Sequence, residues 1–176
     1  MESAKSRFLR YVTYYTTSDE FTGTSPSTER QKDLGRALMQ ELEALKLEDV
    51  HMDDCGNVLA TLPASEGVDA PVIALIAHMD TAPDASGENV KPRLGADDKA
   101  GVAEIMAAVE TMIEQNTRHG EVRIIFTTDE EIGNGVDGLD VQQLGCDYGY
   151  TVDGGPLGEI EFENLSLIHI SEPTRH

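Results

Sequence analysis

Leucines recur at helical spacing in the first third of the chain. Those at positions 34, 38, 42 and 45 fall on one side, which predicts an amphipathic helix over about residues 29–45. Thr28, with Gln31 three residues later, is a capping-box pattern typical of a helix start. A shorter amphipathic helix is expected within the first 14 residues, with an apolar side made by Phe8, Leu9, Val12 and Tyr15.

Continuous apolar runs further along the chain are typical of strands buried on both faces. Residues 71–77 and 121–126 have this pattern, and residues 98–115 between them have the periodicity of a helix. Further strands are expected at residues 50–53, 58–62, 148–152 and 159–163. This alternation predicts an α/β domain in which a largely parallel sheet has helices on both faces.

Side chains that bind metals follow several of these predicted elements. Three strands end in such groups and the long helix begins with another pair: His78 and Asp80, Glu130 and Glu131, Asp153, and Asp97-Asp98. In open α/β sheets, ligands bind at the carboxyl ends of the strands. The four groups are therefore expected to meet at one edge of the sheet.

Each group also has a plain structural explanation. His78 and Asp80 could be an ordinary strand-end histidine and a turn-forming aspartate. Asp97-Asp98 could cap a helix, 129–131 could be solvated charge, and Asp153 could belong to a turn. Their common position at strand ends and a helix start favours a site. Imidazole and carboxylates without cysteine suit Zn²⁺, Mn²⁺ or Co²⁺. More ligands than one ion needs indicate two ions, with adjacent Glu130 and Glu131 free to divide metal binding from proton transfer.

The overall charge agrees with a carboxylate-rich site. The 176 residues include 13 basic and 33 acidic ones, a formal net charge of −20, which disfavours nucleic acid and anionic membranes as partners. No apolar run reaches the roughly 20 residues needed to span a bilayer. Two cysteines cannot make a disulfide scaffold, and the N-terminus lacks the apolar segment of a secretory signal, so a cytoplasmic location is expected.

The candidate residues lie in four ordered motifs. These are HMDT at 78–81, GADDKAG at 95–101, TDEEIG at 128–133 and YTVDGG at 150–155. Together they resemble the peptidase T family, the tripeptide aminopeptidases of the dinuclear-zinc exopeptidase superfamily. The resemblance runs from about Arg7 to Asn164, and it implies the N-terminal part of such a catalytic domain.

The resemblance also implies two zinc ions and their ligands. His78 and Asp153 would bind one ion, Glu131 would bind the other, and Asp97 would bridge the two. The peptide bond that follows the bridging aspartate is cis in this family, so the same is expected for Asp97-Asp98.

The catalytic roles come from the same resemblance. Asp80 would hold and polarise His78, and Glu130 would act as the general base. The implied reaction is hydrolysis of the N-terminal residue from tripeptides by a metal-activated water, with Glu130 passing the proton to the leaving amine. Short peptides with a free N-terminus are the implied partners.

Three features depart from the family pattern. His78 and Asp97 are only 19 residues apart, whereas the family has a longer segment there, so an internal shortening near residues 93–94 is expected. The chain stops before the second domain and before a further histidine ligand. Residues 165–176 do not resemble the family and read as translated adaptor sequence. Residues 1–164 are therefore expected to be a partial catalytic domain with a non-native tail.

Two other functions remain open at this point. The same metal core serves dipeptidases, carboxypeptidases and N-acyl amino acid amidohydrolases of the superfamily. A non-catalytic, acidic module that binds divalent metals would use the same ligands but would not need Glu130. This chain by itself is expected to bind metal weakly and to have negligible peptidase activity.

Overall fold

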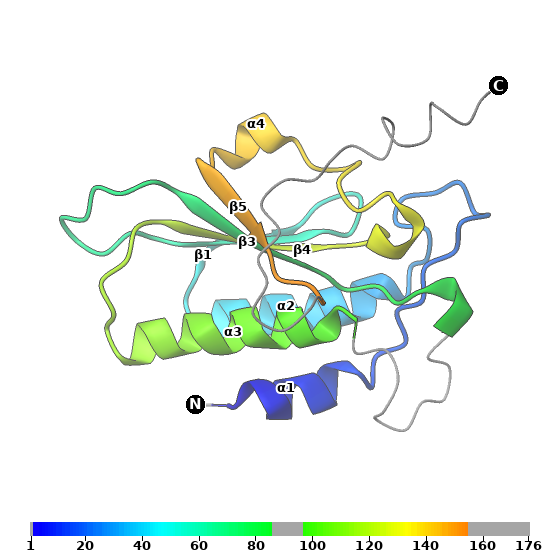
Figure 1. Cartoon of the computed structure of the whole chain (residues 1–176), viewed down its shortest axis with the longest axis horizontal. Helices are drawn as coiled ribbons and strands as arrows, with labels where there is room; N and C mark the ends of the chain where they lie inside the picture. Colours follow the sequence, from blue (N-terminus) through cyan, green and yellow to red (C-terminus); the bar gives the residue numbers. More distant parts are fainter. Residues whose placement is uncertain (1, 86–96, 155–176) are drawn as a thin grey trace.

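A five-stranded sheet with helices packed on it forms the domain in the computed structural model, which describes residues 2–85 and 97–154 (Figure 1). The helices are α1 (Ala4–Tyr11), α2 (Gln31–Ala44), α3 (Lys99–Glu114) and α4 (Val141–Leu144). The strands are β1 (Glu48–Met52), β2 (Val58–Leu62), β3 (Ile73–His78), β4 (Val122–Thr127) and β5 (Tyr148–Thr151). The strand expected at 159–163, the tail at 165–176 and the shortening near 93–94 lie outside the described residues.

The strand order in the sheet is β1-β2-β4-β3-β5. β3 runs parallel to both of its neighbours, with His78 opposite Thr127 of β4 and Ile76 opposite Thr151 of β5. β2 is antiparallel to β4 and to β1, so the sheet is mixed. Because β4, β3 and β5 are parallel and adjacent, their carboxyl ends meet at one edge. The predicted α/β class is confirmed.

The three longer helices lie together on one side of the sheet, and the short α4 lies on the other (Figure 1). α3 packs on β3 and on α1, while α2 packs on β1 and β2. The apolar core fills the space between these helices and the sheet, and its fully buried members include Leu34, Leu38, Leu42, Val58, Met79, Val102, Met106, Val109, Ile124 and Phe126.

The predicted faces of α2 and α3 are confirmed, because the leucines of α2 and the apolar residues of α3 point into this core. The face predicted for α1 is wrong in part. Arg7 and Tyr11 are buried there, and Leu9 is 42% exposed. Arg7 can be buried because its guanidinium pairs with Glu41 of α2 at 3.3 Å and with Glu110 of α3 at 3.0 Å. Hydrophobic periodicity does not register this charge pairing, which lets Arg7 lie on the buried side of α1.

The capping box predicted at Thr28 is also wrong. α2 begins after Arg30, and no side chain caps its first turn. The Thr28 hydroxyl donates to the Thr17 carbonyl oxygen at 2.8 Å. Gln31 is fully buried, and its amide donates to the Thr28 hydroxyl at 3.2 Å and to Asp129 at 2.6 Å. Among the helices that the structure describes, none is long and apolar enough to cross a membrane.

Leu38→Ala tests the core that α2 makes with the sheet. Leu38 is fully buried, so the substitution leaves a cavity and should lower the free energy of unfolding by about 2–5 kcal/mol in a urea titration. Leu9→Ala, at a half-exposed position, should cost less than about 1 kcal/mol. Equal losses for the two variants would contradict this core.

Candidate metal centre

His78 ends β3 at the edge where the parallel strands finish. Its side chain is buried, with 2% exposed, and its Nδ1 atom lies 3.2 Å from Oδ1 of Asp80. Asp80 is itself fully buried. The Asp80 carboxylate therefore faces one imidazole nitrogen. The other nitrogen, Nε2, is the atom that could bind a metal ion.

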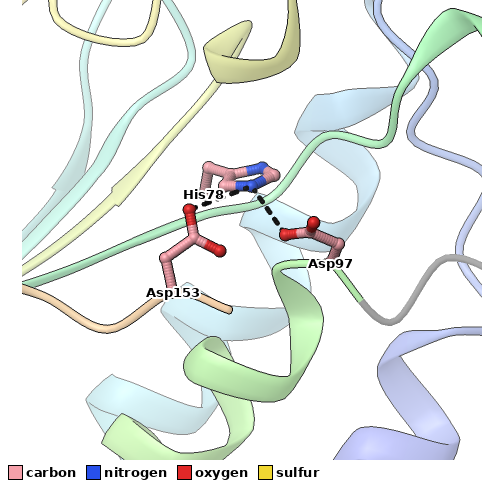
Figure 2. Close-up of side chains that lie close together, drawn as sticks. All are labelled: His78, Asp97 and Asp153. Atoms are coloured by element: carbon pink, nitrogen blue, oxygen red, sulfur yellow. Dashed lines mark ion pairs between the residues drawn. The ribbon is translucent and has the colours of Figure 1, made fainter. Parts of the chain in front are cut away.

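Three carboxylates surround Nε2 of His78. Its distances are 3.4 Å to Oδ1 of Asp97, 3.7 Å to Oε2 of Glu130 and 3.9 Å to Oδ2 of Asp153. Figure 2 shows Asp97 and Asp153 directed at the ring from two sides. One donor atom from each of His78, Asp97 and Asp153 lies within 4.8 Å of the others. The three donors come from β3, from the start of α3 and from the end of β5.

Asp98 places Asp97 beside the histidine. It is the N-cap of α3, where its side chain accepts from the N–H of Gly101 at 3.1 Å. The other carboxylate oxygen accepts from the N–H of His78 at 3.2 Å. One buried carboxylate thus joins the end of β3 to the start of α3. The Asp97-Asp98 peptide bond is cis, as the resemblance implies.

Glu130 and Glu131 follow β4 in a 3₁₀ turn, Glu130–Ile132. Asp80 holds this turn, because its two oxygens accept from the N–H groups of Glu130 at 3.0 Å and of Glu131 at 3.2 Å. The structure brings the Glu130 carboxylate to His78. Within the described residues, the group with metal-ligand spacing is limited to His78, Asp97 and Asp153, and Glu131 lies outside it.

The crowding of acids changes several pKa values. Burial lowers the pKa of His78, but the adjacent Asp80 and the further charges of Asp98 and Glu130 raise it more, to about 9. Burial raises the pKa of Asp98 to about 7, helped by Asp153. Burial and Asp153 also raise the pKa of Asp97. The site without a cation therefore retains protons that a cation would displace.

The residues present suit a divalent cation. The donor set is an imidazole nitrogen and carboxylate oxygens, the combination that Zn²⁺, Mn²⁺ and Co²⁺ accept. The histidine has a carboxylate behind it to fix its tautomer, as ligand histidines usually do. Asp97 and Asp153 are partly exposed, which leaves the ligand side of the ring open.

Other residues that shape the site escape sequence inspection. Gly101 lies where an added Cβ would approach the Val152 carbonyl oxygen to 2.1 Å, so only glycine lets the segment carrying Asp153 approach α3. Gln31 and Asp129 are buried and bonded to each other across the fold. The sequence marks Gln31 only through its place in the apparent capping box. In the structure its side chain bonds to Asp129.

Comparison with known proteins identifies the family. Residues 74–175 match the profile described as peptidase family M20/M25/M40. The chain belongs to this family. Among similar M20/M25/M40 proteins, peptidase T of Parabacteroides distasonis is 42% identical over 204 residues, covering 91% of this chain and 50% of the relative. Peptidase T of Halothermothrix orenii is 42% identical over 211 residues, covering 94% and 52%. The chain spans about half the length of the curated relatives it matches.

Solved structures agree with the family and the fold. The aminopeptidase PepT of Bacillus cereus has 29% sequence identity and a TM-score of 0.69, over 87% of this chain and 43% of that one. A tripeptidase of Staphylococcus aureus has 26% identity and a TM-score of 0.65, over the same shares. A Bacillus subtilis protein described as a dinuclear metal binding peptidase of the M20 family shares the fold at 20% identity and a TM-score of 0.61, over 87% and 44%.

Gly101→Ala tests how Asp153 is brought to the site. The new Cβ would lie 2.1 Å from the Val152 carbonyl oxygen, so the chain after β5 must move away from α3. We expect the free energy of unfolding to fall by about 1–3 kcal/mol, the usual cost of overpacking. Chemical shifts should change at Val152 and Asp153.

Gly149→Ala is the matched control in β5, because its Cβ would meet the nearest atom, in Ile76, at an ordinary 3.5 Å. A Gly101→Ala variant as stable as Gly149→Ala, with unchanged shifts at Asp153, would contradict the close approach.

Proposed function

We propose that this chain is the N-terminal part of a two-metal aminopeptidase that removes the N-terminal residue from tripeptides. The observation that carries the proposal is the ring of three carboxylates around the free nitrogen of a buried histidine, in a chain of an M20 peptidase family. The names of its relatives, peptidase T and tripeptidase, support the substrate class.

The proposed ligands divide between two ions. His78 and Asp153 would hold the first, and Asp97 would reach both because it lies beside His78 and is the most exposed of the three. Glu131 would belong to the second ion, which fits its place outside the group of three. Zinc is the proposed metal, supported by the imidazole and carboxylate donors.

Each protein group has a defined part in the proposed reaction. A bound divalent ion supplies Lewis-acid activation of water and of the scissile carbonyl. Asp80 keeps the His78 ring oriented through Nδ1. Glu130 accepts a proton from the attacking water and delivers it to the amine that leaves when the peptide bond breaks. The partial exposure of the Glu130 side chain, at 50%, leaves it accessible to a peptide.

The boundaries of the parent domain are part of the proposal. Residues 1–164 would be a shortened piece of the catalytic domain, and residues 165–176 a non-native tail. The alignment with the Parabacteroides distasonis relative extends over 204 positions, although 91% of 176 residues is only about 160. About 44 positions therefore have no residue of this chain opposite them, which supports an internal shortening. A cytoplasmic location is proposed from the two cysteines and the composition.

Two alternatives share this metal core. A sister hydrolase, such as a dipeptidase, would differ in residues beyond this half of the protein. A non-catalytic metal-binding module would have no use for Glu130 close to the histidine. The 3.7 Å approach of Glu130 to His78 favours a catalytic site.

Metal binding should depend steeply on pH. The pKa of His78 is raised to about 9, and the ion needs the neutral ring, so a proton must leave below that pH. The apparent affinity for Co²⁺, followed by its visible absorption, should rise about tenfold per pH unit from about pH 6 to about pH 9 and then level off. His78→Ala should abolish binding, whereas His51→Ala, at an exposed position, should not. A flat pH profile would exclude His78 as a ligand.

Glu130→Gln separates catalysis from metal binding. In a full-length peptidase that carries this sequence, it should lower kcat by about 10²–10⁴-fold, the usual contribution of general acid–base catalysis. Metal content should stay unchanged, because the substitution removes no proposed ligand. The readouts are hydrolysis of a tripeptide and metal analysis of the purified protein.

The same two measurements are made on the isolated 176-residue chain. It should bind metal weakly and hydrolyse tripeptides negligibly. If the chain cleaves tripeptides rapidly and Glu130→Gln changes nothing, the assignment of Glu130 is wrong. If the full-length wild type binds metal but hydrolyses no tripeptide, a sister hydrolase or a binding module takes its place.

A further inference from the structure

The segment that carries Glu130 consists of two buried residues followed by the half-exposed glutamate. Thr128 and Asp129 are 3% and 1% exposed, while the side chain of Glu130 is half exposed. Asp129 has a left-handed backbone with φ of 60°, a conformation that few residues other than glycine adopt. Because Glu130 follows directly in the chain, its position depends on what holds Asp129 as well as on its own bond to Asp80.

Asp129 is held by the chain that leads into α2. One carboxylate oxygen accepts from the N–H of Ser27 at 2.6 Å, and the other accepts from the Ser27 hydroxyl and from Nε2 of Gln31 at 2.6 Å. The N–H of Asp129 donates to Oε1 of Gln31 at 3.0 Å. Gln31 thus makes a reciprocal pair of hydrogen bonds with one residue, 98 positions away in the chain.

This arrangement is an unusual way to bury a carboxylate. Among the described residues, no lysine, arginine or histidine forms an ion pair with Asp129, so hydrogen bonds alone compensate its burial. A buried charge without a partner charge is costly. Gln31 and Ser27 are themselves buried, at 0% and 4% exposed. The three side chains form a buried hydrogen-bond network, and the peptide bond from Asp129 to Glu130 connects it to the site.

The two residues on either side of Asp129 are held by other elements. The N–H of Thr128 donates to Oδ1 of Asn57, in the turn between β1 and β2, at 3.0 Å. The N–H of Glu130 donates to Asp80. Three consecutive N–H groups thus end on three different buried side chains, those of Asn57, Gln31 and Asp80. Hydrogen bonds from three consecutive N–H groups to three different elements restrict both the position and the direction of this segment.

We propose that Asp129 and Gln31 are positioning residues that aim the Glu130 carboxylate at the site through the left-handed turn at Asp129. The inference rests on the proposed function for the role of Glu130 as the proton acceptor, but the hold on the turn can be measured without it. Among the described residues, neither side chain forms a hydrogen bond or ion pair with His78 or with the carboxylates around it.

The direct test on this chain is hydrogen exchange of the Glu130 and Glu131 amides, measured by NMR. Asp129→Asn replaces one acceptor oxygen by an NH₂ group that cannot accept from Ser27, and Gln31→Met keeps the volume but removes both amide bonds. Both variants should speed exchange at Glu130 and Glu131 at least tenfold more than at the amides of β4. Ile124→Val, a core control of β4, should speed exchange across the whole sheet.

The second readout is kinetic and uses the full-length peptidase. Asp129→Asn should lower kcat about 10–100-fold, with KM changed by less than about threefold, because a misplaced catalytic group affects the chemical step. In a Glu130→Gln background the same substitution should lower kcat by less than about twofold further. Ile124→Val should leave kcat near the wild-type value, as a merely structural loss would.

The outcomes separate the inference from the proposed function. Faster exchange at Glu130 with no tripeptide hydrolysis by the wild type would uphold the positioning and overturn the function. Tripeptide hydrolysis with an unchanged kcat in Asp129→Asn would overturn the positioning and leave the function standing. Exchange that rises uniformly in Asp129→Asn, as in Ile124→Val, would also overturn it.

Discussion

The site depends on the carboxylate of one buried residue, Asp80. It lies against Nδ1 of His78 and accepts from the N–H groups of Glu130 and Glu131, so it joins the end of β3 to the turn after β4. Its two oxygens accept one hydrogen bond each from these N–H groups, and Nδ1 of His78 lies 3.2 Å from one of them. The same two oxygen atoms thus face the imidazole ring and help to place both glutamates.

The sequence predicts the part of the site that follows from strand direction. Three predicted strands are followed by His78, Glu130 and Asp153, and parallel neighbouring strands bring such ends to one edge of a sheet. The place of Asp97 beside His78 could be anticipated as well, because a helix that begins at this edge presents its first residues there. Strands and helix starts are indicated by residues that are close together in the chain, so a single sequence is enough to predict them.

The network around Asp129 could not be predicted in this way. Gln31 has the spacing of a capping box, but besides the nearby Ser27 and Thr28 hydroxyls its amide bonds to a residue 98 positions later. Asp129 looks like one of three adjacent surface acids, although it is 1% exposed. Periodicity and capping rules describe neighbours within a helix or a strand. Which polar group meets which across the fold depends on packing that those rules do not contain.

The exposed strand β5 couples the stability of the sheet edge to the site. All four of its residues are exposed, it lies at the edge of the sheet, and Asp153 comes two residues after its end. Fraying of this strand would carry Asp153 away from the histidine and open the group. By linkage, anything that bridges Asp153 to His78 must also fasten the edge strand. With the site occupied, β5 would separate from β3 less often, and the free energy of binding would set how often it does so.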